Sequence, residues 1–196
     1  LVLNYYEGLS NAAAADVQAA IARGADFLDR LLAEDGIIYG VTTGYGDSCT
    51  VTVPPELVAE LPHHLYTYHG CGLGAHFTPE QTRAIMATRL ASLCKGFSGV
   101  SVELLEQISR LLAADLLPLI PSEGSVGASG DLTPLSYLAA ALCGEREVLH
   151  GGQVVDASHA LDNDAVDLSV RHAAFDFALN ARECCSHFVA IGKVQR

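Results

Sequence analysis

The most informative stretch of the chain reads Gly124-Ser125-Val126-Gly127-Ala128-Ser129-Gly130-Asp131-Leu132-Thr133-Pro134-Leu135-Ser136. It is rich in glycine and other small residues, and glycine tolerates backbone dihedrals that are closed to other residues. Asp131 stands where an N-cap would precede the next helix, with Thr133-Pro134 in the first turn. The simplest interpretation is therefore a tight loop that caps a helix.

A second interpretation is covalent chemistry within the backbone of this loop. In a tight enough turn, the amide nitrogen of Gly130 reaches the carbonyl carbon of Ala128. Ring closure with loss of two waters, one of them involving the Ser129 side chain, would leave an exocyclic methylene that is strongly electrophilic. No standard side chain supplies such an electrophile, so enzymes that need one bind or build it. We expect replacement of Ser129 to abolish the chemistry while leaving a chain that folds.

Three segments of the chain resemble the aromatic amino acid ammonia-lyases, a family that includes the histidine, phenylalanine and tyrosine lyases and related aminomutases. Gly124 to Ser136 is similar to the signature in which these enzymes form 4-methylidene-imidazol-5-one (MIO) from Ala-Ser-Gly, here Ala128, Ser129 and Gly130. Tyr39-Gly40-Val41-Thr42-Thr43-Gly44-Tyr45-Gly46 resembles the family's Tyr-Gly-x-x-Thr-Gly-Phe-Gly loop. His69-Gly70-Cys71-Gly72-Leu73-Gly74 resembles the stretch that lines the substrate's aromatic ring. The three segments occur in family order over roughly residues 17–150.

The resemblance implies removal of ammonia from an α-amino acid to give an arylacrylate. Tyr39, by its match to the loop tyrosine, is implied to be the base that takes the β-proton. A phenol has an ordinary pKa of about 10, so it would need a nearby positive dipole or donor to act as phenolate. Without the motif, Tyr39 would be interpreted as a packed aromatic residue beside a turn. The implied substrate-binding residues are Tyr68, His69, Gly46 and Leu73.

The implied substrate is a small aromatic amino acid. A polar pocket wall rejects an analogue that lacks the hydroxyl or ring nitrogen, because buried polar groups are then left unpaired. His69 and Tyr68 therefore favour L-histidine or L-tyrosine over L-phenylalanine, with urocanate-type or coumarate-type products. Two alternatives stay open: an MIO-dependent aminomutase, and a catalytically incomplete helical scaffold, since the family's later motifs have no counterpart in these 196 residues. Family active sites draw residues from several subunits of a tetramer, so a homotetramer is implied.

The histidines do not form a metal-binding pattern. His63 and His64 are adjacent and would point in different directions on a helix, and no carboxylate or cysteine lies at ligand spacing. We expect them on a solvated helix face and expect no metal. The six cysteines show no CxxC spacing, and most lie in apolar helical contexts. They are interpreted as small core residues in a reducing compartment, which predicts a cytoplasmic protein.

The amino-acid composition further limits the class of protein and the kinds of partner that the chain can have. Half of the 196 residues are hydrophobic and 17% are charged, as in a packed globular protein. A formal net charge of −12 argues against nucleic acid or an anionic membrane as partner, since both need clustered Lys and Arg. No apolar run is long enough for a membrane span, and no signal-peptide layout is present at the start.

Helical periodicity dominates the chain and predicts a mainly α class. This would be a helical domain carrying a Gly-rich MIO loop, similar to the N-terminal part of the ammonia-lyase (L-aspartase-like) fold. We expect an MIO-bearing domain over residues 1–156 and a helical tail over 157–196 that has no recognised motif. The expected elements are helices over 12–33, 54–68, from Thr78 to before Gly96, 101–114 and 133–143, a hairpin over 148–155, and one long amphipathic helix in the tail.

Overall fold

The computed structural model describes residues 13–34, 36–44, 46–58, 60–124 and 132–163. The described chain is mostly helical, as predicted. Its elements are α2 (Ala13–Ala33), a 3-10 helix (Gly46–Thr50), α3 (Pro55–Val58), α4 (Leu61–His69), β1 (Leu73–His76), α5 (Pro79–Leu93), α6 (Val102–Ala113), β2 (Leu117–Pro118), β3 (Pro121–Glu123), α7 (Leu132–Leu142), β4 (Glu147–His150), β5 (Gln153–Asp156) and α8 (Ala157–Asn163).

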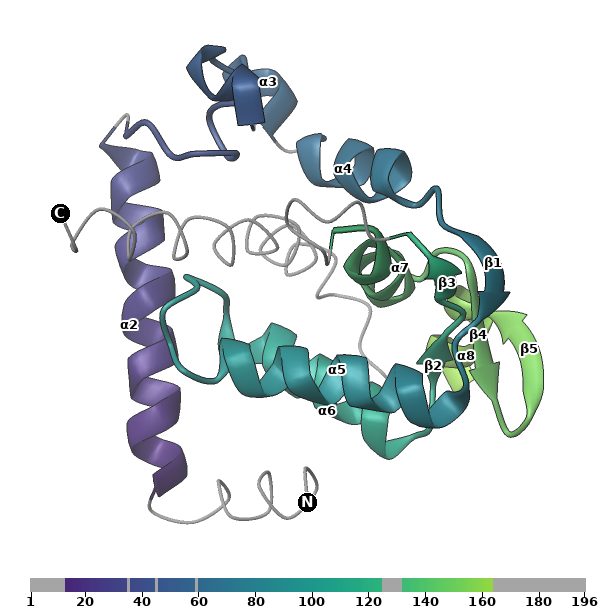
Figure 1. The fold of residues 1–196 in the computed structure, drawn as a ribbon. Coiled ribbons are helices and arrows are strands. Elements are labelled where there is room, and N and C mark those ends of the chain that lie inside the picture. The colour runs from purple at the N-terminus through teal and green to yellow at the C-terminus, as the bar shows by residue number, and fades with distance from the viewer. Residues whose placement is uncertain (1–12, 35, 45, 59, 125–131, 164–196) are drawn as a thin grey trace, which may run out of the picture.

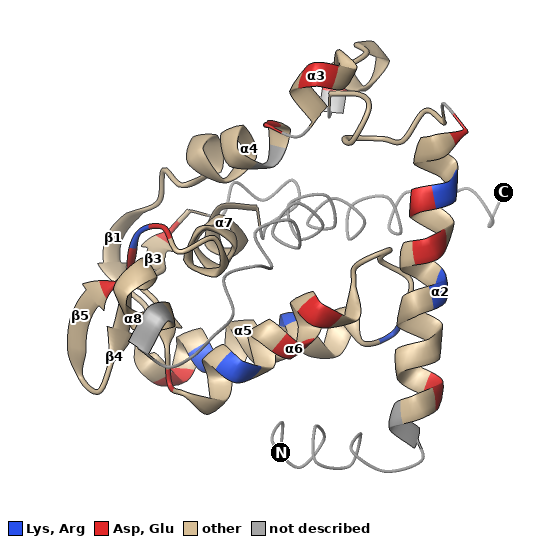
Figure 2. Cartoon of the chain, turned by 180° about the vertical axis from the view of Figure 1, so that it is seen from behind, with Lys and Arg blue, Asp and Glu red and all other residues tan. Residues whose placement is uncertain are grey.

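The helices are arranged around α5, α6 and α7. Helices α5 and α6 lie side by side, α4 packs along α7, and α2 crosses the far end of the α5–α6 pair (Figure 1). The strands gather at the opposite end of the molecule from α2 (Figure 1). Acidic and basic side chains are interspersed along α2 (Figure 2), so this helix presents no continuous basic stripe of the kind that binds nucleic acid.

Two helix starts follow directly from their capping residues. Thr78 accepts a hydrogen bond from the backbone N–H of Gln81, whose side chain accepts one from Thr78 N–H, and this reciprocal pair is a capping box. Ser101 accepts from the backbone N–H of Leu104 and caps α6 through this single side-chain hydrogen bond. The predicted starts of both helices are therefore confirmed.

The core lies between α5, α6, α7 and the strands that follow them. Its most enclosed side chains have less than 2% of their surface exposed and are mainly leucines. Met86, Leu93, Leu104, Ile108, Leu111 and Leu138 are among them. The apolar stripe expected on the helix over 101–114 is buried at Leu104, Leu105, Ile108 and Leu111, and its last member, Leu112, is half-buried.

The predicted helix over 54–68 is wrong in one respect, because it is two helices. A proline in the first turn of α4 starts a new helix there, since proline lacks the N–H that would continue the preceding one. A single helix over 54–68 was expected to turn Leu57, Val58, Leu61 and Leu65 inward, but Leu57 lies on the short helix α3 and is 47% exposed. Leu65, on α4, is buried as predicted.

The strands form two small antiparallel sheets, with orders β1-β3 and β2-β4-β5. The β4–β5 hairpin confirms the predicted one, and its two-residue turn is Gly151-Gly152, with φ of 56° and 79°. Positive φ at both turn residues is what a type I′ hairpin requires. Strands β1, β2 and β3 were not predicted, because they are two to four residues long and two of them contain proline.

The end of the described chain packs on the same core. Ala157, Ala160 and Leu161 of α8 are buried, and α8 contacts α7, β4 and β5. The apolar stripe predicted for the long tail helix lies outside the described residues, and the division into 1–156 and 157–196 remains a prediction. Within the described residues, no helix combines the length and apolarity needed to cross a bilayer.

Candidate active site

The predicted electrophile lies between two described elements. Ala128, Ser129 and Gly130 fall outside the described residues, as does Asp131. The chain enters this loop from β3, through Gly124, and leaves it at Leu132, where α7 begins. The geometry of the two flanks therefore fixes where the loop starts and ends.

The two flanks of the loop meet. A Cβ placed on Gly124 would lie 2.5 Å from Cγ2 of Thr133, in the first turn of α7, and 3.6 Å from the Cα of Gly72. The φ of Gly124 lies outside the left-handed region, so glycine is needed there because the Thr133 side chain approaches its backbone closely. The two described ends of the loop, Gly124 and Thr133, therefore lie next to one another.

Strand pairing brings the His69–Gly74 segment to the same place. Strand β1 pairs antiparallel with β3, with Leu73 opposite Glu123. Gly72, just before β1, would place a Cβ 3.0 Å from the Cβ of Pro121 and 3.4 Å from Cγ2 of Thr133. Two of the three family-like segments are thus neighbours through a sheet that sequence reasoning did not anticipate.

The Tyr39 loop is held by two threonine hydroxyls. Thr42 Oγ1 accepts from Ile38 N–H at 2.9 Å, and Thr43 Oγ1 accepts from Gly40 N–H at 2.9 Å. Gly40 has φ of 73°, in the left-handed region that favours glycine. Tyr39 projects from this fixed turn with 45% of its surface exposed. The threonines were not predicted as site residues, although they belong to the motif that suggested Tyr39.

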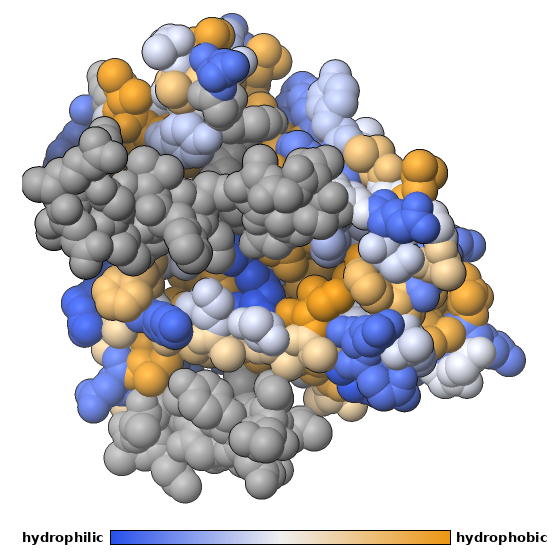
Figure 3. All heavy atoms as spheres, in the orientation of Figure 1, coloured by the Kyte–Doolittle hydropathy of each residue, from blue (hydrophilic) through white to orange (hydrophobic). Residues whose placement is uncertain are grey.

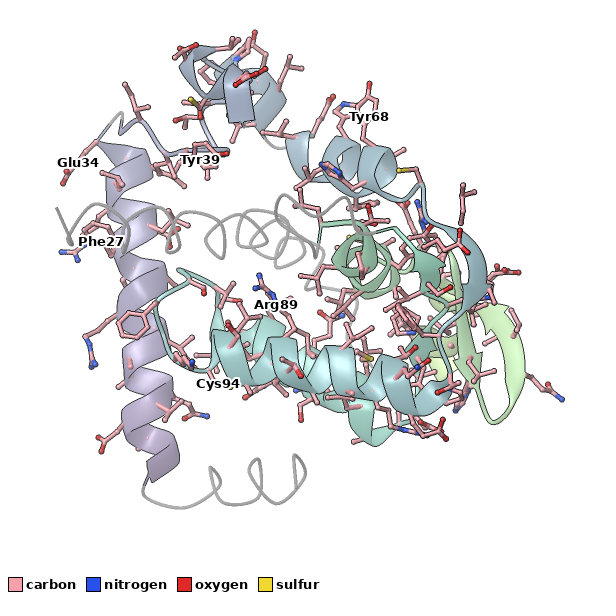
Figure 4. All side chains as sticks on the ribbon, viewed as in Figure 1. Phe27, Glu34, Tyr39, Tyr68, Arg89 and Cys94 are labelled. Carbon is pink, nitrogen blue, oxygen red and sulfur yellow. The ribbon has the colours of Figure 1, made fainter. Side chains whose placement is uncertain are left out.

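The predicted substrate-binding residues do not all converge in the described chain. Tyr68 is 77% exposed and Leu73 is 70% exposed, whereas His69 is half-buried. Gly46 begins the 3-10 helix after the Tyr39 loop. Figure 4 shows Tyr39 on the loop after α2 and Tyr68 further along, on α4, so the two phenols come from separate parts of the fold. The described residues of one chain do not enclose a substrate between these two rings.

A buried tyrosine at the α4–α7 contact was missed from the sequence. Tyr66 is 5% exposed, and its hydroxyl donates to Oε1 of Glu145 at 3.0 Å. Nδ1 of His63 lies 2.9 Å from the same hydroxyl oxygen. Burial, followed by the neighbouring Cys143 and Glu145, raises the pKa of Tyr66 well above its ordinary value. No local pattern could reveal a contact between residues 79 positions apart.

Both histidines are exposed on α4, as expected of a solvated helix face. His64 is exposed and lies 3.8 Å from Glu60, as a residue on a solvated face would. His63 is also exposed but contacts Tyr66 and lies 3.5 Å from Oε1 of Glu145, so it is part of a hydrogen-bonded cluster. Among the described residues, no three His, Cys, Asp or Glu side chains are grouped to hold a metal ion.

The interpretation of most cysteines as small core residues holds for two of the four described ones. Cys94 and Cys143 are partly buried, as expected of small core residues, and burial raises the pKa of the Cys94 thiol. Cys49 and Cys71 are exposed, because they lie in the 3-10 helix and in the turn before β1 and not on an inward helix face. No disulfide joins these four cysteines.

Comparison with known proteins shows the family to which the chain belongs. The model of a family described as aromatic amino acid lyase matches residues 2–172, and the chain belongs to that family. Histidine ammonia-lyase from Halalkalibacterium halodurans is 38% identical over 162 residues, which cover 83% of this chain and 32% of that protein. The chain spans about a third of the length of this relative.

Two solved structures support the same assignment. Histidine ammonia-lyase from Trypanosoma cruzi has a TM-score of 0.72 and 30% identity, over 84% of this chain and 31% of that one. Tyrosine aminomutase from Streptomyces globisporus has a TM-score of 0.71 and 34% identity, over 78% of this chain and 28% of that one. The predicted fold is confirmed by these likenesses.

Proposed function

We propose that this chain carries the MIO-forming part of an ammonia-lyase that acts on L-histidine. The proposal is supported by the likeness of 83% of the chain to a histidine ammonia-lyase. It is also supported by the contact between the His69–Gly74 segment and the flanks of the Ala128-Ser129-Gly130 loop. Histidine is favoured over tyrosine because this relative is named for histidine. His69 supplies the polar ring contact that such selectivity needs.

The described flanks fit an internally formed MIO group. Gly124 and Thr133 approach closely, so the two ends of the segment that would form the group are held near one another. MIO, formed from Ala128, Ser129 and Gly130, would supply the electrophile that makes the substrate amine a better leaving group. Helix α7 begins directly after the loop, and its free N–H groups favour negative charge there.

Tyr39 is proposed as the base for the β-proton. The Thr42 and Thr43 hydrogen bonds fix the turn that carries it, and a fixed position is the first requirement of a general base. Gly46, Tyr68, His69 and Leu73 are proposed to contact the substrate. Tyr68 and Leu73 are exposed in the single chain, which supports a homo-oligomeric site, a tetramer by family likeness, in which another copy covers them.

Other exposed apolar side chains support the same oligomer. Ile37, Phe27, Phe97 and Val51 are at least 60% exposed, and orange areas occur at several places on the face in Figure 3. Large apolar side chains on a surface often mark an interface. No disulfide joins the four described cysteines, which supports a reducing compartment, and we propose the cytoplasm.

The test is deamination by the purified enzyme in its full encoded length. Incubation with L-histidine should release ammonia and a urocanate-type product, followed by its ultraviolet absorbance. Ser129→Ala should abolish the reaction with the helical circular dichroism unchanged, and Tyr39→Phe should reduce it strongly. Lack of ammonia release from L-histidine and L-tyrosine by folded wild-type enzyme would contradict the proposal.

An aminomutase is the second candidate, because a tyrosine aminomutase is 34% identical to the chain. The same incubation separates the two reactions. A mutase converts L-tyrosine to a β-amino acid, whereas a lyase releases ammonia and accumulates the arylacrylate. Chromatography of the products on a chiral column distinguishes them directly.

A further inference from the structure

We propose that Arg146 and Tyr137 are positioning residues that hold the main chain of residues 69–72 and so set the ring selectivity of the site. This inference rests on the proposed function, since it concerns the segment proposed to contact the substrate ring. Neither residue belongs to the three segments that carry the family likeness. Both are placed by α7 and the turn that ends it.

The turn after α7 is built to direct side chains back onto α4. Glu145 N–H donates to the carbonyl of Ala140 at 2.8 Å, and Gly144 N–H donates to that of Ala141 at 3.0 Å, the pair of bonds of a Schellman motif. Gly144 has φ of 74°, as this motif requires. Arg146 follows with φ of 65°, an uncommon conformation for a residue with a side chain. Such strain persists only where the surroundings hold it.

Arg146 and Tyr137 each hold one peptide group of the segment. Nη2 of Arg146 donates to the carbonyl oxygen of Gly70 at 3.2 Å. The backbone N–H of Gly72 donates to the hydroxyl oxygen of Tyr137 at 3.1 Å. The guanidinium carbon of Arg146 lies 4.3 Å from the centre of the Tyr137 ring, so the two side chains also support one another.

This arrangement explains the glycine at position 70. Gly70 has φ of −77°, which any residue can adopt, so its backbone conformation does not require glycine. A Cβ there would instead overlap the guanidinium group of Arg146. The glycine leaves room for a charged group to lie against the main chain next to His69.

The position of this main chain determines where the His69 side chain, proposed to contact the substrate ring, lies. The Gly70 carbonyl lies one residue beyond His69, and the Gly72 amide lies three residues beyond it. Rotation of either peptide group would shift the imidazole relative to Gly124 and Thr133, the described flanks of the Ala128-Ser129-Gly130 loop, which lie beside Gly72. Small displacements of positioning groups change rates by large factors, so selectivity should respond before the fold does.

The experiment compares variants of the full-length enzyme. Tyr137→Phe, Arg146→Ala and Gly70→Ala are assayed for kcat/KM on L-histidine and on L-tyrosine, with Arg110→Ala as the matched control. Arg110 is an exposed arginine on α6 that pairs with Glu106 at 3.2 Å, away from the segment. Loss of one hydrogen bond is worth about a fivefold change in the ratio of the two kcat/KM values.

The expected result is a shift of roughly fivefold or more in that ratio for each of the three variants and none for Arg110→Ala. Gly70→Ala should add nothing in the Arg146→Ala background, because both changes remove the same contact. Arg146→Lys should restore only part of the ratio, since lysine keeps the charge but not the planar group. Amide exchange at Gly72 should be faster by a similar factor in Tyr137→Phe.

Three outcomes decide against parts of the proposal. In the first outcome, the wild-type enzyme deaminates L-histidine, and every variant loses thermal stability but keeps the wild-type ratio of kcat/KM on L-histidine to kcat/KM on L-tyrosine. This result overturns the positioning role and leaves the proposed function standing. Unchanged exchange at Gly72 in Tyr137→Phe overturns the main-chain contact itself. A folded wild-type enzyme that deaminates neither amino acid overturns the proposed function and, with it, this inference.

Discussion

Replacement of Tyr66 by phenylalanine tests the polar contact between α4 and the turn after α7. The ring would remain buried, and only the hydroxyl that joins Glu145 and His63 would be lost. The side chains of both partners are about half exposed, with relative exposures of 47% and 56%, so water can replace the lost contacts. We therefore expect Tyr66→Phe to lower the free energy of unfolding by about 1 kcal/mol near neutral pH.

The same variant should change the response to alkaline pH. The folded state raises the pKa of Tyr66, so it keeps this proton at pH values where the unfolded chain, with a pKa of about 10, has lost it. Stability from this group is present below about pH 10 and falls by about 1.4 kcal/mol per pH unit above it. The Tyr66→Phe variant has no hydroxyl proton to lose, so its stability does not fall for this reason. The difference in free energy of unfolding between wild type and variant should therefore disappear by roughly pH 11.

The assay is urea unfolding of the full-length protein, followed by circular dichroism, at a series of pH values. Tyr68→Phe is the matched control, because Tyr68 lies on the same helix and is 77% exposed. Its gap to the wild type should stay close to zero throughout. A constant gap between Tyr66→Phe and the wild type from neutral to alkaline pH would refute the assignment of the raised pKa to this contact.

Further predictions concern the scaffold, each measured as a change in thermal unfolding. Thr78→Ala removes the capping box of α5 and should cost about 1 kcal/mol, whereas Thr88→Ala on the exposed face of the same helix should cost less. Ile108→Ala, at a fully buried position, should cost about 2–5 kcal/mol, and an equal effect at half-buried Leu112 would contradict the placement of the core. Gly152→Ala should lower stability by about 1 kcal/mol through backbone strain alone, because φ is 79° and an added Cβ would meet no atom within 4 Å. An unchanged unfolding temperature would argue against this hairpin turn.

The helices were predictable because their signals are local. Thr78-Pro79 and Ser101 mark helix starts by capping, and the stripe of α6 marks its inward face. The β4–β5 hairpin followed from Gly151-Gly152 for the same reason. The break before α4 was missed because helical periodicity continues across it while a proline restarts the helix.

The site was predictable only as separate segments. Likeness to the family singled out Tyr39, His69 and the Ala128-Ser129-Gly130 loop. The approach of the His69–Gly74 segment to the flanks of that loop, however, depends on the pairing of β1 with β3. These strands are too short to have a recognisable alternation. The contacts of Arg146 with Gly70 and of Glu145 with Tyr66 join residues 76 and 79 positions apart, and such pairs are set by how α7 packs on α4.

The intact mass of the folded full-length wild-type protein tests the proposed MIO chemistry most directly. We predict a mass lower than that of the encoded chain by two waters, with the loss located by fragmentation to residues 128–130. The Ser129→Ala variant should show no such loss. An unshifted mass for freshly purified, folded wild-type protein would mean an open peptide at these residues and would contradict the proposed lyase.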